Sequence, residues 1–315
     1  MTTPGSRGIV ARGIRRSFGA VEAVRNVSLE AQPGRVTGLV GPNGSGKTTL
    51  LLMLSSLLAP DAGEIRIAGI DPIEDPQSAR AILGWMPDAL GAWGSLSALE
   101  TLTLTGRLYG MPQPVAAARA VTLLGQVGLS DLAAAPARVF SRGQKQRLGL
   151  ARALVHDPHV LLLDEPASGL DPQARIDLRV HLRRFAAEGR TVLVSSHVLA
   201  ELEEVIDDAV FLVAGETVDA GRVAAAARGS REWRIRVSDS SPTDAATAVA
   251  TALGRAPDDV AIDRQDVIVA FETERAAAAA LRALVQADMA VAEFAPARGS
   301  LEETFLDLGG RDGDS

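Results

Sequence analysis

The sequence predicts an α/β protein with a mostly parallel sheet core, a helical insertion and a second, smaller α+β domain. Continuous apolar runs such as "VLLLD" and "TVLVSS" are typical of strands buried on both faces of a sheet. These runs alternate with helical segments, as in layered α/β folds. Near Gly229 the pattern changes to short, alternating strands and helices, which indicates a separate domain.

The first domain is expected to span residues 1–225. Period-two or continuous apolar patterns predict strands over residues 21–31, 35–41, 64–69, 159–166 and 190–197. Between them, residues 88–151 show helical periodicity, for example in "VAAARAVTLLGQVGL". A further helix is expected over residues 171–188. The domain is therefore a strand-rich core with a helical insertion.

The second domain is expected to span residues 230–308. Its elements follow the order β-α-β-β-α-β: "REWRIRVSD", "PTDAATAVATALG", the hairpin "DVAIDRQDVIVAFE", "TERAAAAALRALVQ" and "MAVAEFAP". That order is typical of a small ferredoxin-like sandwich. A last helix is expected in "SLEETFLDL", and residues 309–315 are expected to be disordered.

Composition excludes several classes of protein. The net charge of −7 argues against bare DNA or RNA as the main partner, so we expect no nucleic acid. The chain has no cysteine, which excludes disulfides and thiolate metal sites. No apolar run reaches the roughly 18–20 residues that span a bilayer, and residues 1–19 do not read as a secretion signal. We therefore expect a cytoplasmic protein.

A glycine-rich phosphate-binding loop follows the strand predicted over residues 35–41. "GPNGSGKT" fits the P-loop pattern G-x-x-x-x-G-K-[ST], in which glycines let backbone N–H groups approach phosphate oxygens. Lys47 is expected to reach the β- and γ-phosphates, and the Thr48 hydroxyl to bind Mg²⁺. The expected nucleotide-contacting residues of this loop are Gly41, Asn43, Gly44, Ser45, Gly46, Lys47, Thr48 and Thr49.

Two carboxylates end a later buried strand. Asp164 is expected to hold Mg²⁺, and Glu165 to act as the general base that polarises the attacking water. The alternative is that both carboxylates only solubilise a strand end. Lys47 and Asp164 lie more than about 100 positions apart, more than one strand–helix–strand unit occupies, which again indicates an insertion.

An ordered series of motifs resembles the ATP-binding cassette (ABC) family, the motor subunits of ABC transporters. "FSRGQKQRLGLARAL" resembles the family signature, and "SGLD", ending at Asp171, resembles the D-loop. "SSH", ending at His197, resembles the switch histidine, and "RSFG" resembles the A-loop with Phe18 over adenine. The resemblance covers about residues 8–225 and implies a P-loop core with an antiparallel β subdomain. The tail, particularly "SLEETFLDL", is similar to the accessory domain of ABC-2-type exporters.

The resemblance also assigns roles. A signature helix N-terminus would face the γ-phosphate of ATP on a second subunit, so that ATP joins two chains; the residues concerned are Ser141, Gly143 and Gln144. His197 would contact the γ-phosphate, unless it is a structural histidine. Asp171 belongs to the nucleotide-proximal set but more plausibly shapes the subunit interface. Phe18 stacks on adenine or is simply a core residue.

Two positions depart from the family pattern. Arg142 stands where the signature usually has its first glycine, and it either adds a contact to phosphate or faces solvent. Asp88 stands where the Q-loop most often has glutamine. Aspartate can also ligate Mg²⁺, so Asp88 is expected to be a metal ligand together with Thr48 and Asp164.

The sequence therefore predicts an ATP-hydrolysing motor subunit of an ABC exporter, with ATP and Mg²⁺ as cofactors. It would work as a homodimer on the inner face of the cell membrane, driving a separate transmembrane permease. Alternatives are an importer motor and a soluble, non-transport ABC ATPase. A translation factor would carry two cassettes, and a P-loop GTPase would carry an N-K-x-D motif; neither feature is found in the sequence.

Overall fold

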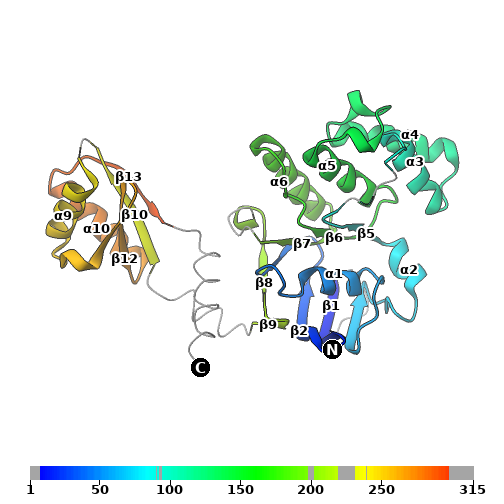
Figure 1. The fold of residues 1–315 in the computed structure, drawn as a ribbon, viewed down its shortest axis with the longest axis horizontal. Coiled ribbons are helices and arrows are strands. Elements are labelled where there is room, and N and C mark those ends of the chain that lie inside the picture. The colour runs from blue at the N-terminus through cyan, green and yellow to red at the C-terminus, as the bar shows by residue number, and fades with distance from the viewer. Residues whose placement is uncertain are drawn as a thin grey trace. The chain divides into compact units, whose positions relative to one another are not determined.

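The structure is a computed structural model that describes residues 8–89, 91, 94–197, 202–218, 231–238 and 240–297 (Figure 1). The chain forms two compact units, residues 1–218 and residues 219–315. The first unit contains a nine-stranded sheet in the order β4-β1-β2-β9-β8-β3-β7-β6-β5. Its strands are β1 (Ile9–Phe18), β2 (Val21–Ala31), β3 (Val36–Val40), β4 (Ala62–Ile67), β5 (Leu83–Met86), β6 (Val160–Asp164), β7 (Thr191–Ser196), β8 (Asp208–Val213) and β9 (Glu216–Thr217).

Five neighbouring strands of this sheet run parallel and form its central part. β3 pairs with β7 and β8, and β6 pairs with β5 and β7, all in parallel register. Every residue of β3, β6 and β7 is buried, because helices cover both faces. The predicted α/β fold with a mixed, largely parallel sheet is confirmed.

Helices α1 (Lys47–Leu54) and α6 (Pro172–Ala187) lie on opposite sides of these parallel strands (Figure 1). Leu50 and Leu54 of α1 pack in one core cluster with Leu162 of β6. On the other face, Val194 of β7 shares a cavity wall with Leu178 of α6. Since side chains alternate along a strand, β6 and β7 contribute side chains to the packing on both faces of the sheet.

An antiparallel ribbon flanks the parallel part. β1 pairs with β2 and β4 in antiparallel register, and its buried side chains Ile9, Ala11 and Ile14 join the core cluster beneath α1. β2 matches the strand predicted over residues 21–31, whereas β1 has no counterpart among the predicted strands. Register shifts after Ala11 and Ile14 break its alternation, and alternation is the pattern on which strand prediction depends.

Helices dominate the segment between β5 and β6, as expected of the insertion. They are α3 (Ala98–Leu108), α4 (Gln113–Gln126) and α5 (Arg142–Ala153), with the short α2 (Pro76–Ala81) just before β5. α3 and α4 pack as a pair, and α5 contacts both of them as well as β5. α3 starts with a reciprocal capping box between Ser97 and Glu100, which fixes where this helical segment begins.

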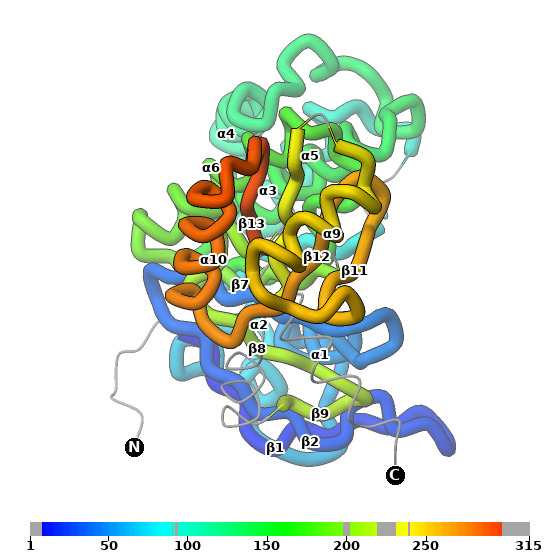
Figure 2. Tube along the Cα trace, turned by 90° about the vertical axis from the view of Figure 1, so that its left-hand side faces the viewer, coloured from blue at the N-terminus to red at the C-terminus, as the bar shows by residue number. Residues whose placement is uncertain are grey.

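The second unit has the predicted β-α-β-β-α-β order. Its elements are β10 (Arg231–Val237), α9 (Pro242–Leu253), β11 (Val260–Asp263), β12 (Asp266–Phe271), α10 (Glu274–Gln286) and β13 (Val291–Pro296). The sheet order is β11-β12-β10-β13, with every neighbouring pair antiparallel, which is the ferredoxin-like arrangement. Both helices cover the same face of the sheet, and Figure 2 looks onto them.

Each helix of this unit has clear boundary signals. Ser241 caps α9 and Pro242 occupies its first turn, while Gly254 ends it in a left-handed conformation. Thr273 caps α10. The core between helices and sheet contains Ile235, Val249 and Leu284. The predicted last helix, the predicted tail over residues 309–315 and the predicted domain boundary near residues 224–230 lie outside the described residues.

Candidate active site

The phosphate-binding loop connects β3 to α1, and its glycines are required by close packing. A Cβ at Gly41 would lie 2.3 Å from the carbonyl oxygen of Leu212 on β8. Gly46 has φ +99°, and a Cβ there would lie 2.5 Å from the carbonyl oxygen of Ala23. No other residue type fits either position, because both neighbours are backbone atoms. The loop therefore wraps tightly over the ends of β2 and β8.

The N-terminus of α1 is built to attract an anion. Gly46 precedes it without a side-chain cap, and its first turn contains no acidic residue. The first N–H groups of the helix and its dipole therefore favour negative charge at this end. Lys47 is buried beside them, and its Nζ donates to the carbonyl oxygens of Gly41 at 2.7 Å and Pro42 at 3.1 Å.

Burial lowers the pKa of Lys47, while the neighbouring carboxylates of Glu165 and Asp164 raise it. The net shift is downward, because desolvation of the ammonium outweighs the two attractions. The two carbonyl oxygens that now accept its hydrogen bonds are uncharged. A phosphate oxygen carries charge and is a stronger acceptor, so the Lys47 ammonium is available for one.

The acidic pair ends β6 directly opposite this loop. Asp164 is almost fully buried, and two hydroxyl groups donate to its carboxylate: Thr48 Oγ1 to Oδ2 at 2.9 Å, and Ser195 Oγ to Oδ1 at 2.6 Å. These bonds join the P-loop helix, β6 and β7 at one edge of the sheet. Thr48, Asp164 and Lys47 are thus brought together, as the sequence predicts.

Ser195 is a site residue that the sequence analysis did not single out. Its hydroxyl also accepts a hydrogen bond from the backbone N–H of Glu165 at 3.0 Å. Parallel pairing places Ser195 opposite Asp164, so one buried hydroxyl orients both acidic residues. The available signal was the polar "SS" that ends the otherwise apolar run of β7.

Glu165 and His197 form a contact at the mouth of the site. Glu165 Oε2 lies 2.8 Å from His197 Nδ1, and the Glu165 side chain is only 15% exposed. Glu165 has φ +50°, a left-handed conformation that is rare for a residue with a long side chain. Such backbone strain is commonly concentrated at functional sites, where surrounding bonds hold it in place.

The P-loop and the acidic residues Asp88 and Glu165 line a common cavity of ≈ 260 Å³. A second cavity, of about 340 Å³, lies elsewhere. The walls of the smaller cavity are polar, as a phosphate site requires. The residues that line it are Ala23, Asn43, Gly44, Gly46, Lys47, Thr48, Thr49, Asp88 and Glu165. Asp88, from the segment after β5, therefore lies beside the P-loop, as predicted from the sequence.

The donor set at this cavity suits a magnesium ion. The Thr48 hydroxyl and the Asp164 carboxylate supply hard oxygen donors within hydrogen-bonding distance of each other, and Asp88 lines the same cavity. Mg²⁺ prefers such oxygens and usually keeps part of its water shell next to a phosphate. The residues present therefore fit the ion.

The signature residues lie at the N-terminus of α5 and do not line the phosphate cavity of their own chain. Ser141 Oγ accepts from the Gln144 N–H at 3.2 Å, and the Ser141 N–H donates to Gln144 Oε1 at 2.9 Å. Gly143 packs against the turn at Gly169. A Cβ on Gly143 would lie 3.3 Å from the Gly169 carbonyl oxygen. Asp171 caps α6 by accepting from the Ala174 N–H at 2.9 Å.

Comparison with known proteins identifies this arrangement. The ABC transporter family matches residues 24–168. The daunorubicin resistance ATP-binding protein DrrA3 of Streptomyces coeruleorubidus is 33% identical over 314 residues, which cover 96% of this chain and 96% of the relative. The chain belongs to the ABC transporter family of ATP-binding proteins. It is an ABC ATPase subunit, and the P-loop and acidic pair are in the part that the family matches.

Further relatives match about two thirds of the chain. The ABC transporter ATP-binding protein NatA of Bacillus subtilis is 36% identical over 202 residues, which cover 64% of this chain and 82% of that protein. The Nod factor export ATP-binding protein I of Ralstonia nicotianae is 36% identical over 210 residues, which cover 67% of this chain and 65% of that protein.

Solved structures of ABC ATP-binding cassettes share the fold over about two thirds of the chain. The ATP-binding subunit of an ABC transporter superposes with a TM-score of 0.63 at 26% identity, covering 69% of this chain and 92% of that chain. A dimeric ATP-binding cassette in a post-hydrolysis state, bound to ADP and Pi, superposes with a TM-score of 0.61 at 26% identity over 67% and 97% of the two chains.

Phe18 lies at the end of β1 and is not among the residues that line the phosphate cavity. Its side chain is 50% exposed, and the Arg16 guanidinium lies 5.0 Å from the ring centroid. The alternative of a core phenylalanine is therefore wrong. An exposed ring is accessible to a flat ligand, but its proposed stacking on adenine stays a prediction.

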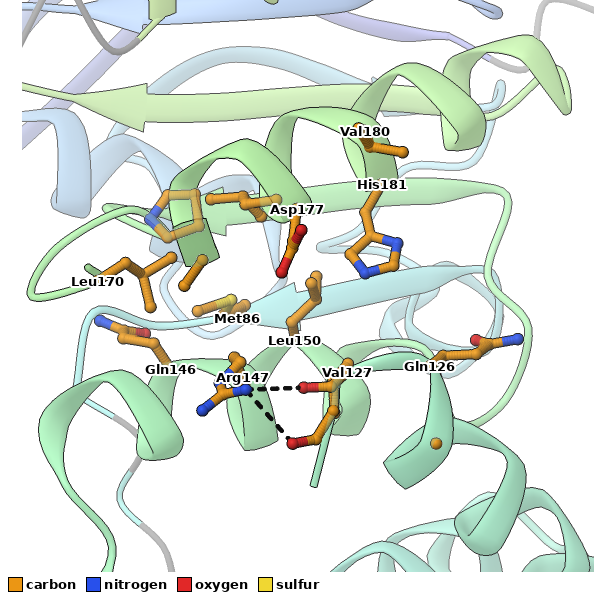
Figure 3. A pocket seen from close by; sticks show the side chains of 15 residues that line it. Met86, Gln126, Val127, Gln146, Arg147, Leu150, Leu170, Asp177, Val180 and His181 are labelled. Carbon is orange, nitrogen blue, oxygen red and sulfur yellow. Dashed lines mark hydrogen bonds between the residues drawn. The ribbon is translucent and has the colours of Figure 1, made fainter. Parts of the chain in front are cut away.

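The cavity of about 340 Å³ lies between α5 and α6 and contains no P-loop residue (Figure 3). Arg147 on its floor donates to the carbonyl oxygens of Val127 and Gly128 at 3.4 and 3.3 Å, and this pair of bonds ties α5 to the end of α4. Leu150 and Leu170 contribute apolar walls.

Among the described residues, no helix has the length and apolar character needed to cross a membrane.

Proposed function

We propose that this ABC ATPase is the motor subunit of an exporter and that it drives a separate transmembrane permease. The observation that carries the proposal is the cavity that joins Lys47, Thr48 and Glu165, with Asp164 bonded to Thr48. Export is supported by the names of relatives, which refer to daunorubicin resistance and to Nod factor export.

The phosphates of ATP would lie over the N-terminus of α1. Backbone N–H groups of the loop would donate to them, and Lys47 would exchange the Gly41 and Pro42 carbonyl oxygens for a phosphate oxygen. Thr48 and Asp164 would hold Mg²⁺, with Asp88 as the third candidate. When bound, the ion neutralises phosphate charge and so assists cleavage of the γ-phosphate bond.

Glu165 would accept the proton of the attacking water. It lines the cavity, and Ser195 holds its backbone N–H while His197 holds its carboxylate. A base must be oriented toward the proton that it removes, and these two contacts supply that orientation. His197 would contact the γ-phosphate as well.

A second copy of the chain would complete each site. The first turn of α5 contains no acidic residue, so its N-terminus also favours an anion. We propose that Ser141, Gly143 and Gln144 face ATP bound to the other subunit, and that Asp171 lies near this subunit interface. The dimeric state of the ADP- and Pi-bound cassette supports this arrangement. ATP would then close the subunit pair, and hydrolysis would release it.

The proposed organisation follows from these roles. Residues 1–225 would form the ATPase domain, residues 88–151 would receive a cytoplasmic helix of the permease, and residues 230–308 would form an accessory domain. The protein would thus lie on the inner face of the cell membrane through its permease. An importer motor shares the same core, and only the partner distinguishes the two.

The proposal is tested by capturing the partner. Tagged Glu165→Gln protein, which is expected to bind ATP without turnover, is incubated with ATP and detergent-solubilised native membranes, recovered and analysed by mass spectrometry. Lys47→Ala is the control, because weakened nucleotide binding should reduce recovery. A stoichiometric polytopic protein is expected. Recovery of ribosomes, DNA complexes or the homodimer alone would contradict the transport proposal, and a permease with a binding-protein partner would indicate import.

A further inference from the structure

The two positions that depart from the family pattern contact each other. Arg142 Nη2 lies 3.7 Å from Asp88 Oδ1, although Arg142 begins α5 and Asp88 follows β5. Gln146, one turn further along α5, donates to the Asp88 carbonyl oxygen at 3.1 Å. One helix therefore holds both the backbone and the carboxylate of Asp88.

The same guanidinium also reaches the segment after the acidic pair. Arg142 Nη2 donates to Ser168 Oγ at 2.5 Å. The stem of Arg142 crosses Gly169, where a Cβ would lie 2.6 Å from Arg142 Cδ and 2.8 Å from Cγ. Because φ of Gly169 is +73° and the space is occupied, glycine lets the arginine pass close to the backbone. The side chain is thus held in place at two points.

Charge explains why Asp88 needs such a partner. Asp88 and Glu165 line the phosphate cavity, and Asp164 lies beside it, while Lys47 is the cation within it. Glutamine at position 88 would add no charge, whereas aspartate adds one more negative charge where ATP must place its phosphates. Like charges at this range oppose binding, and a cation next to the carboxylate reduces that repulsion.

We propose that Arg142 is a positioning residue that neutralises and orients the Asp88 carboxylate, so that the departures at positions 88 and 142 form one compensating pair. The inference rests on the proposed nucleotide site. Arg142 acts here within its own subunit, through Asp88, and it also fixes the N-terminus of α5 to the Ser168 turn. Direct contact of Arg142 with ATP on a second subunit is a different role, and the test separates the two.

The test is a double-mutant cycle of Arg142→Gly and Asp88→Gln, the residues that the family pattern has at these positions. Binding of ADP and of a non-hydrolysable ATP analogue, both with Mg²⁺, is measured at protein concentrations where the chain is monomeric. Arg142→Gly is expected to weaken binding about five-fold, the scale of one partly exposed charge pair. In the Asp88→Gln background the same substitution is expected to weaken it less than about two-fold.

Two further readouts separate positioning from a general structural effect. The coupling should shrink at high salt, since the pair is partly exposed to solvent. Arg142→Lys should restore most of the binding because it restores the charge. Ser168→Ala keeps the Arg142 charge and removes one of its two contacts, so it should weaken binding less than Arg142→Gly does. Thermal unfolding of each variant checks that the fold is intact.

Equal weakening in both backgrounds would overturn the proposal, because Arg142 would then act without Asp88. Unchanged binding in Arg142→Gly would overturn it as well. A loss that is seen only at dimer-forming concentrations would assign Arg142 to the second subunit's nucleotide instead. Native chain that binds no nucleotide in this assay would contradict the proposed site itself, which is a distinct outcome.

Discussion

Ser195→Ala tests how the acidic pair is held. The Ser195 hydroxyl is fully buried, donates to Asp164 and accepts from the Glu165 N–H. Replacing it by alanine removes both bonds and leaves no protein group in their place. We expect a less stable protein with a misoriented base, and therefore a lower turnover number.

The magnitude follows from the two bonds. A hydrogen bond to a charged group contributes about 1.5–3 kcal/mol, and a buried N–H left without an acceptor costs about 1–3 kcal/mol. Because the small void could admit a water molecule that recovers part of this, the expected loss is about 3 kcal/mol of unfolding free energy. That is a large share of the roughly 5–15 kcal/mol that stabilises a typical domain.

The assay is urea unfolding in the absence of nucleotide, together with phosphate release at saturating Mg·ATP. Thr37→Val is a matched control on neighbouring β3, because the Thr37 hydroxyl is equally buried and has no hydrogen-bond partner among the described residues. Valine should therefore be neutral or slightly stabilising. Turnover should fall in Ser195→Ala at little change in KM, since the ground-state phosphate contacts remain.

An unfolding free energy of Ser195→Ala within about 0.5 kcal/mol of the native value, the range of an ordinary surface substitution, would contradict this prediction. Equal destabilisation of Thr37→Val would contradict the prediction as well. The loss would then follow from removing any buried hydroxyl and not from the hydrogen bonds that Ser195 makes.

Three further predictions concern other parts of the first unit. Gly41→Ala should abolish nucleotide binding, because its Cβ would lie 2.3 Å from a backbone oxygen. Gly125→Ala on α4 is the control, because its Cβ would meet the Ser130 Oγ at an ordinary 3.7 Å; it should bind nucleotide like the native protein, and equal affinities of the two variants would contradict the close packing at Gly41. Burial lowers the pKa of His156 from 6.5 to about 4, so the unfolded chain binds a proton that the folded chain does not between these values. The free energy of unfolding should therefore carry no His156 penalty above pH 6.5. It should fall by on the order of 2 kcal/mol as the pH is lowered toward 4, allowing for partial solvent access. His156→Phe, which can still stack on Tyr109, should lack this part of the pH dependence in urea unfolding, whereas an unchanged slope would exclude His156 as its source. Phe18→Ala should weaken ATP binding and Phe18→Trp should preserve it in a fluorescence titration; equal affinity of both variants would contradict stacking on adenine.

Much of the core could be predicted because its signals are local. β3, β6 and β7 are continuous apolar runs, and the P-loop pattern occupies one short stretch between a strand and a helix. The helix predicted over residues 171–188 is α6 within one residue at each end, since Asp171 and Pro172 mark its start. The β-α-β-β-α-β order of the second unit could likewise be predicted from the sequence.

The remainder depends on contacts between segments that are distant in the chain. β1 was not predicted, because its bulges and three arginines obscure the alternation. The role of Ser195 depends on parallel register with β6, and sequence alone does not set which residue faces Asp164. The contact of Arg142 with Asp88 and Ser168 arises from how α5 packs, so two departures that look independent in the sequence are adjacent in space.

Glu165 is the proposed base for ATP hydrolysis at this site. The most direct measurement compares phosphate release and Mg·ATP binding in native protein and in Glu165→Gln, with sedimentation of both in ATP. For Glu165→Gln we predict native-like binding, turnover lowered by about 100-fold or more, and an ATP-dependent dimer that accumulates only in this variant. Hydrolysis by Glu165→Gln at the native rate would contradict it.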